Sequence, residues 1–428
     1  MRRKISLVTS VVAVMAFAVG CGNNGTTTPP AAEPATGGET ATVAPPAEAV
    51  DTDALVIWVD ETRMGPVSAA AHDFTAETGI PVEMVQKNFD DIANDAIAQI
   101  PTGEGPDLFV TAHDNLGRLL VNGVIAPVTL GALANDFEPV AIEAFSQDGQ
   151  LYGVPYAIEN IALIRNVDLA PTAPATWEDA IASGRVEGSQ VPPILIQSDG
   201  ENGDPFHFYP LQTSCGAPVF EQNADGSYNE TIAMGGENGH RFAQWLADQG
   251  HAGNLSQDIT YDIAVQQFAD GNARYIIGGP WMLGSFEGMN LAIDPIPTAC
   301  GDPAQPFAGV QGFFLSSHSR NPIAANNFLT NYAASEEVQV ALADAGGRPP
   351  ALIAAQTQAV ANDETGTMRG FMDVGANAVP MPSIPAMAQV WAFWGVTQAR
   401  IFGGNTTDPN GEWDRMISDI QGAIDANR

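Results

Sequence analysis

Residues 204–210 gather several groups that can recognise a sugar ring. The run Asp-Pro-Phe-His-Phe-Tyr-Pro carries one carboxylate, three aromatic rings and one imidazole between two prolines. Aromatic rings can stack on the C–H faces of a sugar, carboxylates accept hydrogen bonds from its hydroxyls, and proline restricts the backbone of the loop expected here. Asp204, Pro205, Phe206 and Tyr209 are therefore candidate saccharide contacts, although a single aromatic residue is as often part of a hydrophobic core.

Four other segments combine aromatic rings, carboxylates and amides in a similar way. We expect them to meet residues 204–210 in one cleft, because a small ligand is held by apolar and polar groups that converge on it. The four segments are Trp58–Arg63 with Asp60 and Glu61, His113–Asn115, Gly279–Trp281 and Trp391–Trp394. Trp58 lies inside an apolar run and is expected in the core. Trp394 shares a helical face with Trp391, so it is compatible with either core or ligand contact.

Length, charge and motif content limit the possible functions. A chain of 428 residues exceeds one compact core, so we expect two domains. The formal net charge of −34 repels nucleic acid and anionic membrane surfaces, and it favours a neutral or cationic ligand. The sequence has no metal-spaced His/Cys cluster and no Gly-x-Ser-x-Gly or His-Glu-x-x-His motif. We therefore expect no metal, no cofactor and no enzymatic activity.

The N-terminal segment has the features of an export signal. Residues 2–4 are basic, residues 5–19 form an apolar run, and small residues lead into Cys21. This pattern resembles a bacterial lipobox, except that Ala18 stands where leucine is preferred, and it predicts a lipid on Cys21. A plain secreted protein is the alternative. Residues 22–52 are rich in Gly, Thr, Pro, Ala and Glu, which predicts a disordered tether after the signal peptide of residues 1–21.

Buried strands and amphipathic helices alternate over the first part of the chain. This order predicts a parallel α/β sheet, whose ligands bind beyond the carboxyl ends of the strands. Residues 60–63 and 111–115 lie at such ends. We expect strands at 54–59, 81–85 and 108–110, and helices at 67–78, at 90–100 and from an Asp114 cap to Gly123.

A second α/β region follows a segment that we expect to cross between domains. Residues 151–165 form the predicted crossing, and residues 309–315 form a predicted return crossing. Between and after them we expect helices at 176–183 (with Asp179 as capping partner), 239–248, 261–269, 322–345 and 413–426, and strands at 193–197 and 273–277.

Seven short segments in a fixed order resemble the bacterial extracellular solute-binding proteins, specifically the maltose/maltodextrin-binding proteins of ABC transporters. The resemblance covers nearly all of residues 53–428. It implies a two-lobe α/β fold of the periplasmic-binding-protein type II class, with hinge crossings and a ligand cleft between lobes. The implied lobes are residues 53–157 with 308–360, and 161–305 with 365–428. The matching segments are 55–58, 103–107, 112–114, 166–169, 268–271, 279–281 and 381–387.

The resemblance also implies which residues contact the sugar. Arg63 stands where a family lysine contacts hydroxyls, Asp114 and Glu159 match acidic contacts, and residues 204–206 match an acidic-Pro-aromatic platform. The remaining matches are the stacking residues Trp281 and Trp391 and the neighbouring Met381. The chain departs from the family at Thr62, Thr111, Asn115 and Ala392, which affects the preferred glycan and its length.

The function implied by the resemblance is the sugar-binding lipoprotein of an ABC importer. Its expected partners are an oligosaccharide and the permease subunits, with the membrane contacted only through the lipid anchor on its outer face. A monomer is expected. The alternatives are the same fold binding another oligosaccharide or a polyol, such as trehalose, a secreted glycoside hydrolase, and a lipoprotein that serves only as an adhesin or scaffold.

Two cysteines remain after Cys21. An exported protein meets an oxidising environment, so Cys215 and Cys300 are predicted to form a disulfide. Two unpaired buried thiols are the alternative.

Overall fold

The computed structural model describes residues 54–223 and 227–426. The predicted signal peptide over residues 1–21, the lipid on Cys21 and the tether over residues 22–52 lie outside the described residues. The described residues belong to one compact unit. No helix in the described part of the chain is long and apolar enough to span a membrane.

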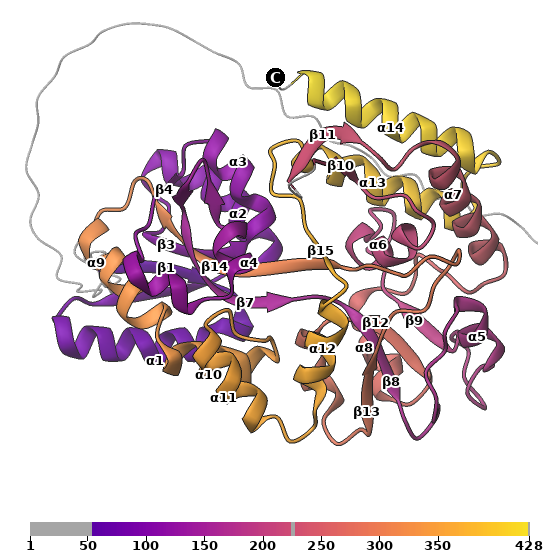
Figure 1. Cartoon of the computed structure of the whole chain (residues 1–428), viewed down its shortest axis with the longest axis horizontal. Coiled ribbons are helices and arrows are strands. Elements are labelled where there is room, and N and C mark those ends of the chain that lie inside the picture. The colour runs from indigo at the N-terminus through magenta and orange to yellow at the C-terminus, as the bar shows by residue number, and fades with distance from the viewer. Residues whose placement is uncertain (1–53, 224–226, 427–428) are drawn as a thin grey trace, which may run out of the picture. The chain divides into compact units, whose positions relative to one another are not determined.

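A mixed sheet forms the centre of the first lobe (Figure 1). Its strands are β1 (Leu55–Val59), β2 (Val82–Gln86), β3 (Leu108–Ala112), β4 (Ile125–Ala126), β7 (Gly153–Glu159), β14 (Phe307–Ser316) and β15 (Val379–Pro380). The hydrogen-bonded order is β15-β14-β3-β1-β2, and β4 and β7 also pair with β14. β1 is parallel to β2 and β3, as predicted, and both β1 and β3 are buried along their whole length.

Helices cover both sides of this sheet. They are α1 (Glu61–Thr78), α2 (Phe89–Gln99), α3 (Leu116–Val121), α4 (Pro139–Ala144), α9 (Pro322–Phe328), α10 (Glu336–Gly346) and α11 (Ile353–Asn362), with 3-10 turns η1 (Ile100–Thr102), η2 (His113–Asn115) and η3 (Gly131–Asp136). A short hairpin, β5 (Ser146–Gln147) and β6 (Gln150–Leu151), follows α4. In Figure 1, α1, α10 and α11 lie on one side of the sheet, and α2 and α3 lie on the other.

Three of the predicted helices differ from the observed ones for reasons that can be seen in their caps and turns. Helix α1 begins before the predicted residue 67, because the Asp60 carboxylate accepts the backbone N–H of Arg63 (3.1 Å) and caps it. Asp114 is not a helix cap, since it lies inside η2 and α3 has no side-chain cap. The helix predicted over 322–345 is divided by the π-turn η5 (Leu329–Ala333), after which Ser335 caps α10.

The second lobe contains a four-stranded sheet in the order β13-β8-β12-β9. Its strands are β8 (Ala162–Asn166), β9 (Ile194–Ile196), β12 (Tyr275–Gly278) and β13 (Leu291–Asp294), and a separate hairpin is made of β10 (Phe220–Gln222) and β11 (Tyr228–Ile232). Its helices are α5 (Trp177–Ala182), α6 (Pro205–Thr213), α7 (Gly236–His251), α8 (Tyr261–Ala269), α12 (Thr367–Gly375), α13 (Met387–Phe402), α14 (Pro409–Ala426) and the 3-10 segment η4 (Pro280–Phe286). The predicted capping box of α5, between Thr176 and Asp179, is confirmed.

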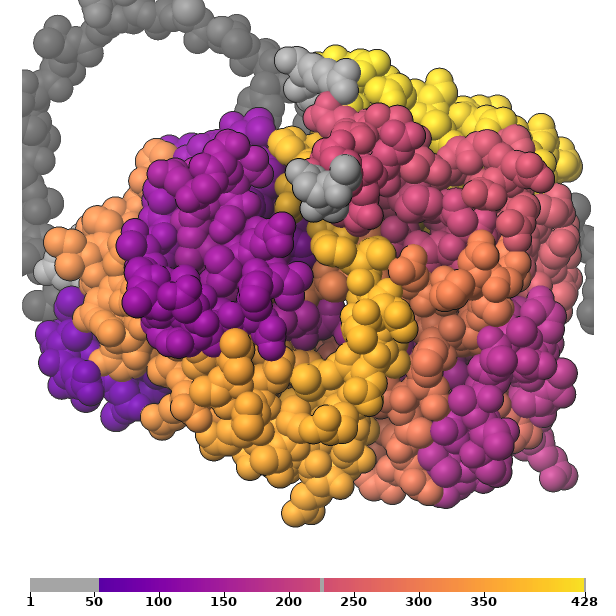
Figure 2. All heavy atoms as spheres, viewed as in Figure 1, coloured from indigo at the N-terminus to yellow at the C-terminus, as the bar shows by residue number. Residues whose placement is uncertain are grey.

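The two sheets have separate hydrophobic cores. One cluster draws on residues 55–157 and 310–355, and another draws on residues 161–307 and 381–424 together with Ala112. The strand pair β7 and β14 leads from the first sheet toward the second, and β8 follows β7 directly. Figure 2 shows the yellow-orange segment around α12 and β15 at the junction of the lobes on this face.

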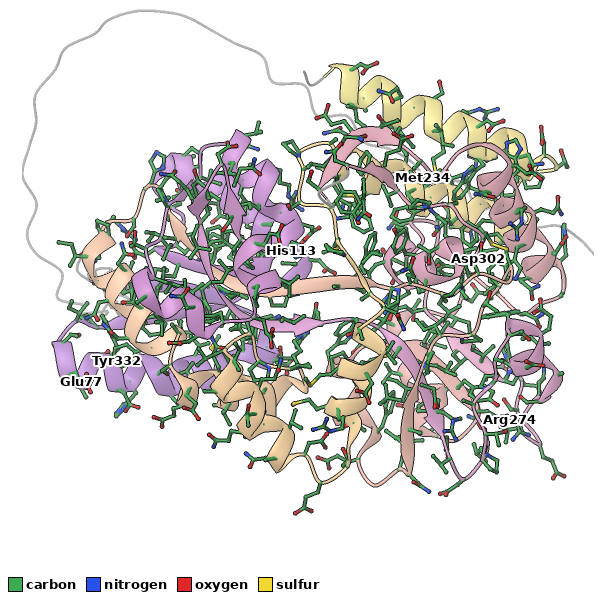
Figure 3. All side chains as sticks on the ribbon, viewed as in Figure 1. Glu77, His113, Met234, Arg274, Asp302 and Tyr332 are labelled. Carbon is green, nitrogen blue, oxygen red and sulfur yellow. A yellow bond between two sulfur atoms is a disulfide. The ribbon has the colours of Figure 1, made fainter. Side chains whose placement is uncertain are left out.

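Hydrogen bonds also tie elements together inside the lobes. Tyr332 of η5 donates to Glu77 Oε2 of α1 at 2.6 Å, and both side chains can be seen side by side in Figure 3. This bond fixes the π-turn against the helix that begins at the end of β1.

Candidate functional site

Arg63 lies in the first turn of α1, at the carboxyl end of β1. Its side chain is 2% exposed, its Nε donates to the Tyr156 hydroxyl, and its Nη1 pairs with Asp60. The guanidinium also lies over the rings of Phe89 (4.8 Å) and Tyr156 (5.4 Å). One buried donor, Nη2, has no hydrogen-bond partner among the described residues. The two N–H groups of Arg63 Nη2 are therefore unpaired, whereas the Asp60 carboxylate is occupied and Glu61 is exposed to solvent.

Glu159 lies at the end of β7, between the two sheets. Its side chain is 8% exposed and forms an ion pair with Arg348, and its Oε1 accepts the Gln311 side-chain N–H at 2.7 Å. Burial alone would lower the pKa of Arg348, but Glu159, with smaller contributions from Tyr156 and Asp60, raises it overall. The Gln311 side-chain oxygen is buried and has no partner among the described residues. The group Glu159–Arg348–Gln311 is therefore charge-balanced and leaves one acceptor open.

Arg348 also joins the two lobes. It follows α10 of the first lobe, and its guanidinium lies 5.4 Å from the ring centre of Trp281 in η4 of the second lobe. Gly347 has a positive φ of 67° at the C-cap of α10, and a side chain there would collide with the carbonyl of Pro280. The close approach of α10 and η4 therefore requires glycine, and it brings a cation onto a predicted stacking ring.

Asp114 and Trp391, predicted as contacts from opposite lobes, touch each other. The Trp391 side-chain N–H donates to the Asp114 carboxylate, which also accepts from the Asn115 side-chain amide at 3.2 Å. Burial raises the pKa of Asp114 to about 6, against the opposing effects of Arg118 and these hydrogen bonds. Asp114 is thus a carboxyl group at the boundary between lobes whose pKa is close to neutral pH.

Four aromatic rings form a continuous group beside these polar residues, which we call the aromatic platform: Phe206, Trp281, Phe307 and Trp391. The ring centres of Phe206 lie 6.4 Å from Trp281 and 6.2 Å from Phe307, and Phe307 lies 6.3 Å from Trp391. Phe206, Trp281 and Trp391 are partly exposed. Their exposed faces can stack on an apolar ring face of a ligand.

Tyr209 and Trp394 lie behind the aromatic platform. They are 1% and 0% exposed, respectively. Tyr209 stacks on Phe307 at 3.7 Å, and Trp394 stacks on Trp391 at 5.5 Å. Both rings are buried among core side chains and back the partly exposed rings, so their role as direct contacts stays a prediction.

The segment 204–210 is helical rather than a loop. Asp204 is the N-cap of α6, accepting the backbone N–H of His207 at 3.2 Å, and Pro205 occupies the first helical position. The other Asp204 oxygen accepts from Gln197 Nε2 (2.6 Å) and lies 2.9 Å from His207 Nδ1. Asp204 therefore holds the platform residue Phe206 in place, and its carboxylate is already engaged.

His113 joins the first lobe to the segment after β15. The Val310 backbone N–H donates to its Nδ1 and its Nε2 lies 3.0 Å from the Met381 carbonyl oxygen, so the proton of the neutral ring is on Nε2. Burial lowers the pKa of His113 to about 4. Met381 thus contributes its backbone to this contact, while its side chain is buried.

Cys215 and Cys300 form a disulfide in the second lobe. Of the two alternatives left by the sequence, the structure contains the bridge. Among the described residues there is no group of three or more His, Cys, Asp or Glu that could hold a metal ion.

Comparison with known families assigns the chain to one of them. Residues 69–368 match the model of the bacterial extracellular solute-binding proteins. The chain belongs to this family. Its fold is the two-lobe periplasmic-binding-protein fold, as predicted.

Individual relatives of this solute-binding protein carry more specific names. The maltodextrin-binding protein MdxE of Bacillus subtilis is 27% identical, with 81% of this chain and 84% of that protein aligned. A maltooligosaccharide ABC transporter solute-binding lipoprotein of Streptococcus pneumoniae is 26% identical over 79% of this chain and 81% of its own. The Thermus thermophilus maltotriose binding protein bound with maltotriose has a TM-score of 0.78 and 30% identity, covering 86% of this chain and all (100%) of that one.

Sequence reasoning missed four residues of the candidate site: Tyr156, Phe307, Gln311 and Arg348. Each belongs to a crossing strand or directly follows a helix, where apolar packing explains most residues. Only Gln311 could have been found from the sequence, because it is a lone amide within the otherwise apolar return crossing 309–315. Arg348 gave no signal, because its partner Glu159 is 189 residues away in sequence.

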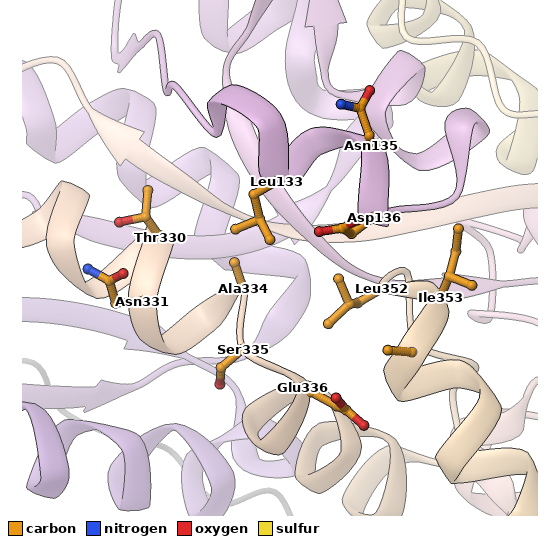
Figure 4. A pocket seen from close by; sticks show the side chains of 11 residues that line it. Leu133, Asn135, Asp136, Thr330, Asn331, Ala334, Ser335, Glu336, Leu352 and Ile353 are labelled. Atoms are coloured by element: carbon orange, nitrogen blue, oxygen red, sulfur yellow. The ribbon is translucent and has the colours of Figure 1, made fainter.

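A separate cavity lies elsewhere on the first lobe. It has a volume of about 680 Å³ and lies between η3, η5 and the start of α11 (Figure 4). Its lining includes Leu133, Asn135, Asp136, Thr330, Asn331 and Glu336. None of the predicted contacts borders it, so it is separate from the site built on the aromatic platform.

Proposed function

We propose that this solute-binding protein binds maltooligosaccharides between its lobes and delivers them to the permease of an ABC importer. The observation that carries the proposal is the aromatic platform, which lies next to the Asp114–Trp391 contact and combines ring faces with a carboxylate. The relatives named for maltodextrin, maltooligosaccharide and maltotriose support the choice of ligand. Their identities of 26–30% leave chain length and linkage to be measured.

The platform would bind the apolar faces of the sugar rings. Phe206, Trp281 and Trp391 keep partly exposed rings, and burying an aromatic face contributes about 25 cal/mol per Å². The Arg348 guanidinium lies over the Trp281 ring and fixes its position. We therefore assign Trp281 as the main stacking residue.

Polar groups with open hydrogen-bonding capacity would bind the hydroxyls. Asp114 would accept from hydroxyls, Arg63 Nη2 would donate, and the Gln311 side-chain oxygen would accept. Hydrogen bonds to charged groups contribute about 1.5–3 kcal/mol each, so Asp114 and Arg63 would dominate selectivity. Glu159 would act mainly by orienting Gln311, because its carboxylate is already shared between Gln311 and Arg348.

Contacts between the lobes would couple binding to closure. The Asp114–Trp391 bond, the Arg348–Trp281 contact and the His113–Met381 bond each join residues of the two proposed lobes. A ligand that touches both lobes shifts the protein toward the closed state by its extra affinity for that state. The permease would recognise this closed state.

We further propose that the protein is exported, that Cys21 carries a lipid, and that the body acts as a monomer on the outer face of the membrane. The lipoprotein named among the relatives supports the anchor. We also propose that the protein has no hydrolase activity, because glycoside hydrolysis needs two available carboxyl groups and, of Asp114, Glu159 and Asp204, the last two are engaged by neighbouring donors. Release of reducing ends from a glucan would contradict this.

Calorimetric titration of the full-length protein with maltose, maltotriose, trehalose and a cyclodextrin tests the function. Saturable binding of maltose or maltotriose is expected, with a loss of at least tenfold in Trp281→Ala and Asp114→Asn. Trp245→Phe is the matched control, because Trp245 lies 7% exposed in the core of the second lobe, away from the platform. Binding of trehalose alone, or of none of the four sugars, would reject the maltooligosaccharide assignment.

A further inference from the structure

A second cavity, with a volume of about 430 Å³, lies in the second lobe next to the hairpin β10–β11. Its lining includes Tyr209, Phe220, Glu221, Gln222, Tyr228 and Gln305. Elements far apart in sequence build it, since α6, the hairpin and β15 all contribute residues. Its volume is within the range of about 300–1,000 Å³ typical of small-molecule sites.

The lining of this hairpin cavity has the chemistry of a neutral sugar site. It combines aromatic rings with one carboxylate and two side-chain amides, which accept from and donate to hydroxyls. Its described lining contains no Lys, Arg or His, so it offers no cation to an anionic ligand. Glu221 would in addition repel an anion. A neutral, hydroxylated ligand is therefore the class that fits.

One of these polar groups is unpaired. Glu221 and Gln222 are exposed at the rim. The Gln222 side chain hydrogen-bonds the Tyr228 hydroxyl, whereas Glu221 has no hydrogen bond or ion pair among the described residues. Burial raises the pKa of Tyr228 to about 12, so its phenol stays neutral, and its hydroxyl donates to the Pro380 carbonyl at 2.7 Å. This bond holds the Tyr228 ring as a fixed wall while Glu221 remains open.

The hairpin cavity is separated from the aromatic platform. Tyr209 lines the cavity and stacks on Phe307, whose ring belongs to the platform on the other side. The strand β15 adds a second partition, because Val379 lines the cavity while the Met381 carbonyl contacts His113. A ligand in the cavity therefore touches different residues from one between the lobes.

We propose that the hairpin cavity is a second saccharide-binding site, which holds one or two sugar rings independently of the site between the lobes. Glu221 and Gln222 bind the hydroxyls, and Tyr228 supplies the apolar face. Because Glu221 and Gln222 are exposed, this site is open to solvent and binds more weakly than the site between the lobes. The proposal goes beyond the transport function and does not require it.

Equilibrium dialysis of the full-length protein against labelled maltotriose, from micromolar to millimolar concentration, tests the proposal. The wild type is expected to bind two equivalents. The double variant Asp114→Asn/Trp281→Ala is expected to lose the tighter equivalent and keep the weaker one. Glu221→Ala/Gln222→Ala is expected to weaken the weaker equivalent at least tenfold and leave the tighter one unchanged.

The control is Glu187→Ala, which removes an exposed carboxylate of the same lobe outside the cavity. Ala233→Trp, which fills the cavity from its own lining, is expected to abolish the weaker equivalent. A single equivalent in the wild type that Asp114→Asn/Trp281→Ala removes would overturn the second site alone. So would a weaker equivalent that survives both Glu221→Ala/Gln222→Ala and Ala233→Trp. A single equivalent that survives Asp114→Asn/Trp281→Ala and is lost in Ala233→Trp would instead reject the proposed function.

Discussion

Replacing Arg348 with methionine should destabilise the protein strongly, because it leaves the Glu159 carboxylate buried without a counter-charge. The two side chains are 10% and 8% exposed, and Glu159 keeps only its hydrogen bond from Gln311. Methionine retains most of the volume of arginine but none of its charge. The change therefore isolates the electrostatic part of the interaction from the packing part.

The expected magnitude follows from this burial. Removing one partner of a buried ion pair costs about 3–5 kcal/mol, because the remaining charge lies in a medium of low polarity. The remaining Gln311 bond reduces the penalty, so we expect a loss of about 3 kcal/mol at neutral pH. The double variant Glu159→Gln/Arg348→Met should recover about 2 kcal/mol of that loss, because a neutral amide avoids the cost of burying an unpaired charge.

The assay is a denaturant titration of the ligand-free, full-length protein at pH 7. Arg400→Met is the matched control, because Arg400 makes a similar ion pair with Glu412 (2.9 Å) while being 48% exposed. An exposed pair contributes about 0–1 kcal/mol, so this control should change the free energy of unfolding little. A loss in Arg348→Met as small as that in the control would refute the argument. So would a double variant that is no more stable than the single one.

Three further predictions concern protonation and the disulfide. Asp114 has a pKa raised to about 6, and hydroxyl donors would lower this pKa on binding. The affinity for maltotriose should therefore fall by up to about tenfold per pH unit below pH 6. In Asp114→Asn the affinity should not depend on pH in this range. His113 stays neutral when folded, with a pKa near 4 against 6.5 when unfolded. The stability of the wild type relative to His113→Gln should therefore fall by about 1.4 kcal/mol per unit from pH 6.5 to 4. Replacing Cys215 and Cys300 by serine, 85 residues apart, should cost about 2–5 kcal/mol of unfolding free energy.

Each of these has a clear contrary result. Titration calorimetry from pH 5 to 7 that shows the same affinity in wild type and Asp114→Asn would remove Asp114 from the site. Urea titrations giving parallel pH profiles for wild type and His113→Gln would mean that His113 does not titrate on unfolding. Two free thiols per chain, not counting Cys21, in the denatured and unreduced protein would exclude the Cys215–Cys300 bridge.

Local patterns in the sequence determined the elements and many candidate residues. The alternation of apolar runs and amphipathic segments predicted the parallel arrangement of β1, β2 and β3, since buried strands and helices have different periods. The Thr176–Asp179 capping box and the helix end at Gly79 were predicted because caps depend on residues that are close in sequence. Short family motifs then identified the fold.

Local rules were less reliable where one residue can take two roles. Asp60 and Asp204 were predicted as ligand contacts, yet both are N-caps. A carboxylate just before a helix can accept hydrogen bonds from the free N–H groups of the helix or from sugar hydroxyls, and the sequence does not distinguish the two. The prolines around residues 204–210 suggested a loop, but Pro205 occupies the first helical position, where its missing N–H has no cost.

Only the tertiary structure decided which groups remain open and which are paired. Glu159 and Arg348 are 189 residues apart, and His113 and Met381 are 268 apart, so no local pattern records either contact. The same holds for Tyr209 and Trp394, whose burial depends on packing of α6 and α13 around Phe307. The sequence alone determined the kinds of side chain that can recognise a sugar. The packing of the two lobes decided which of them are exposed or unpaired, because burial and long-range pairing depend on the whole chain.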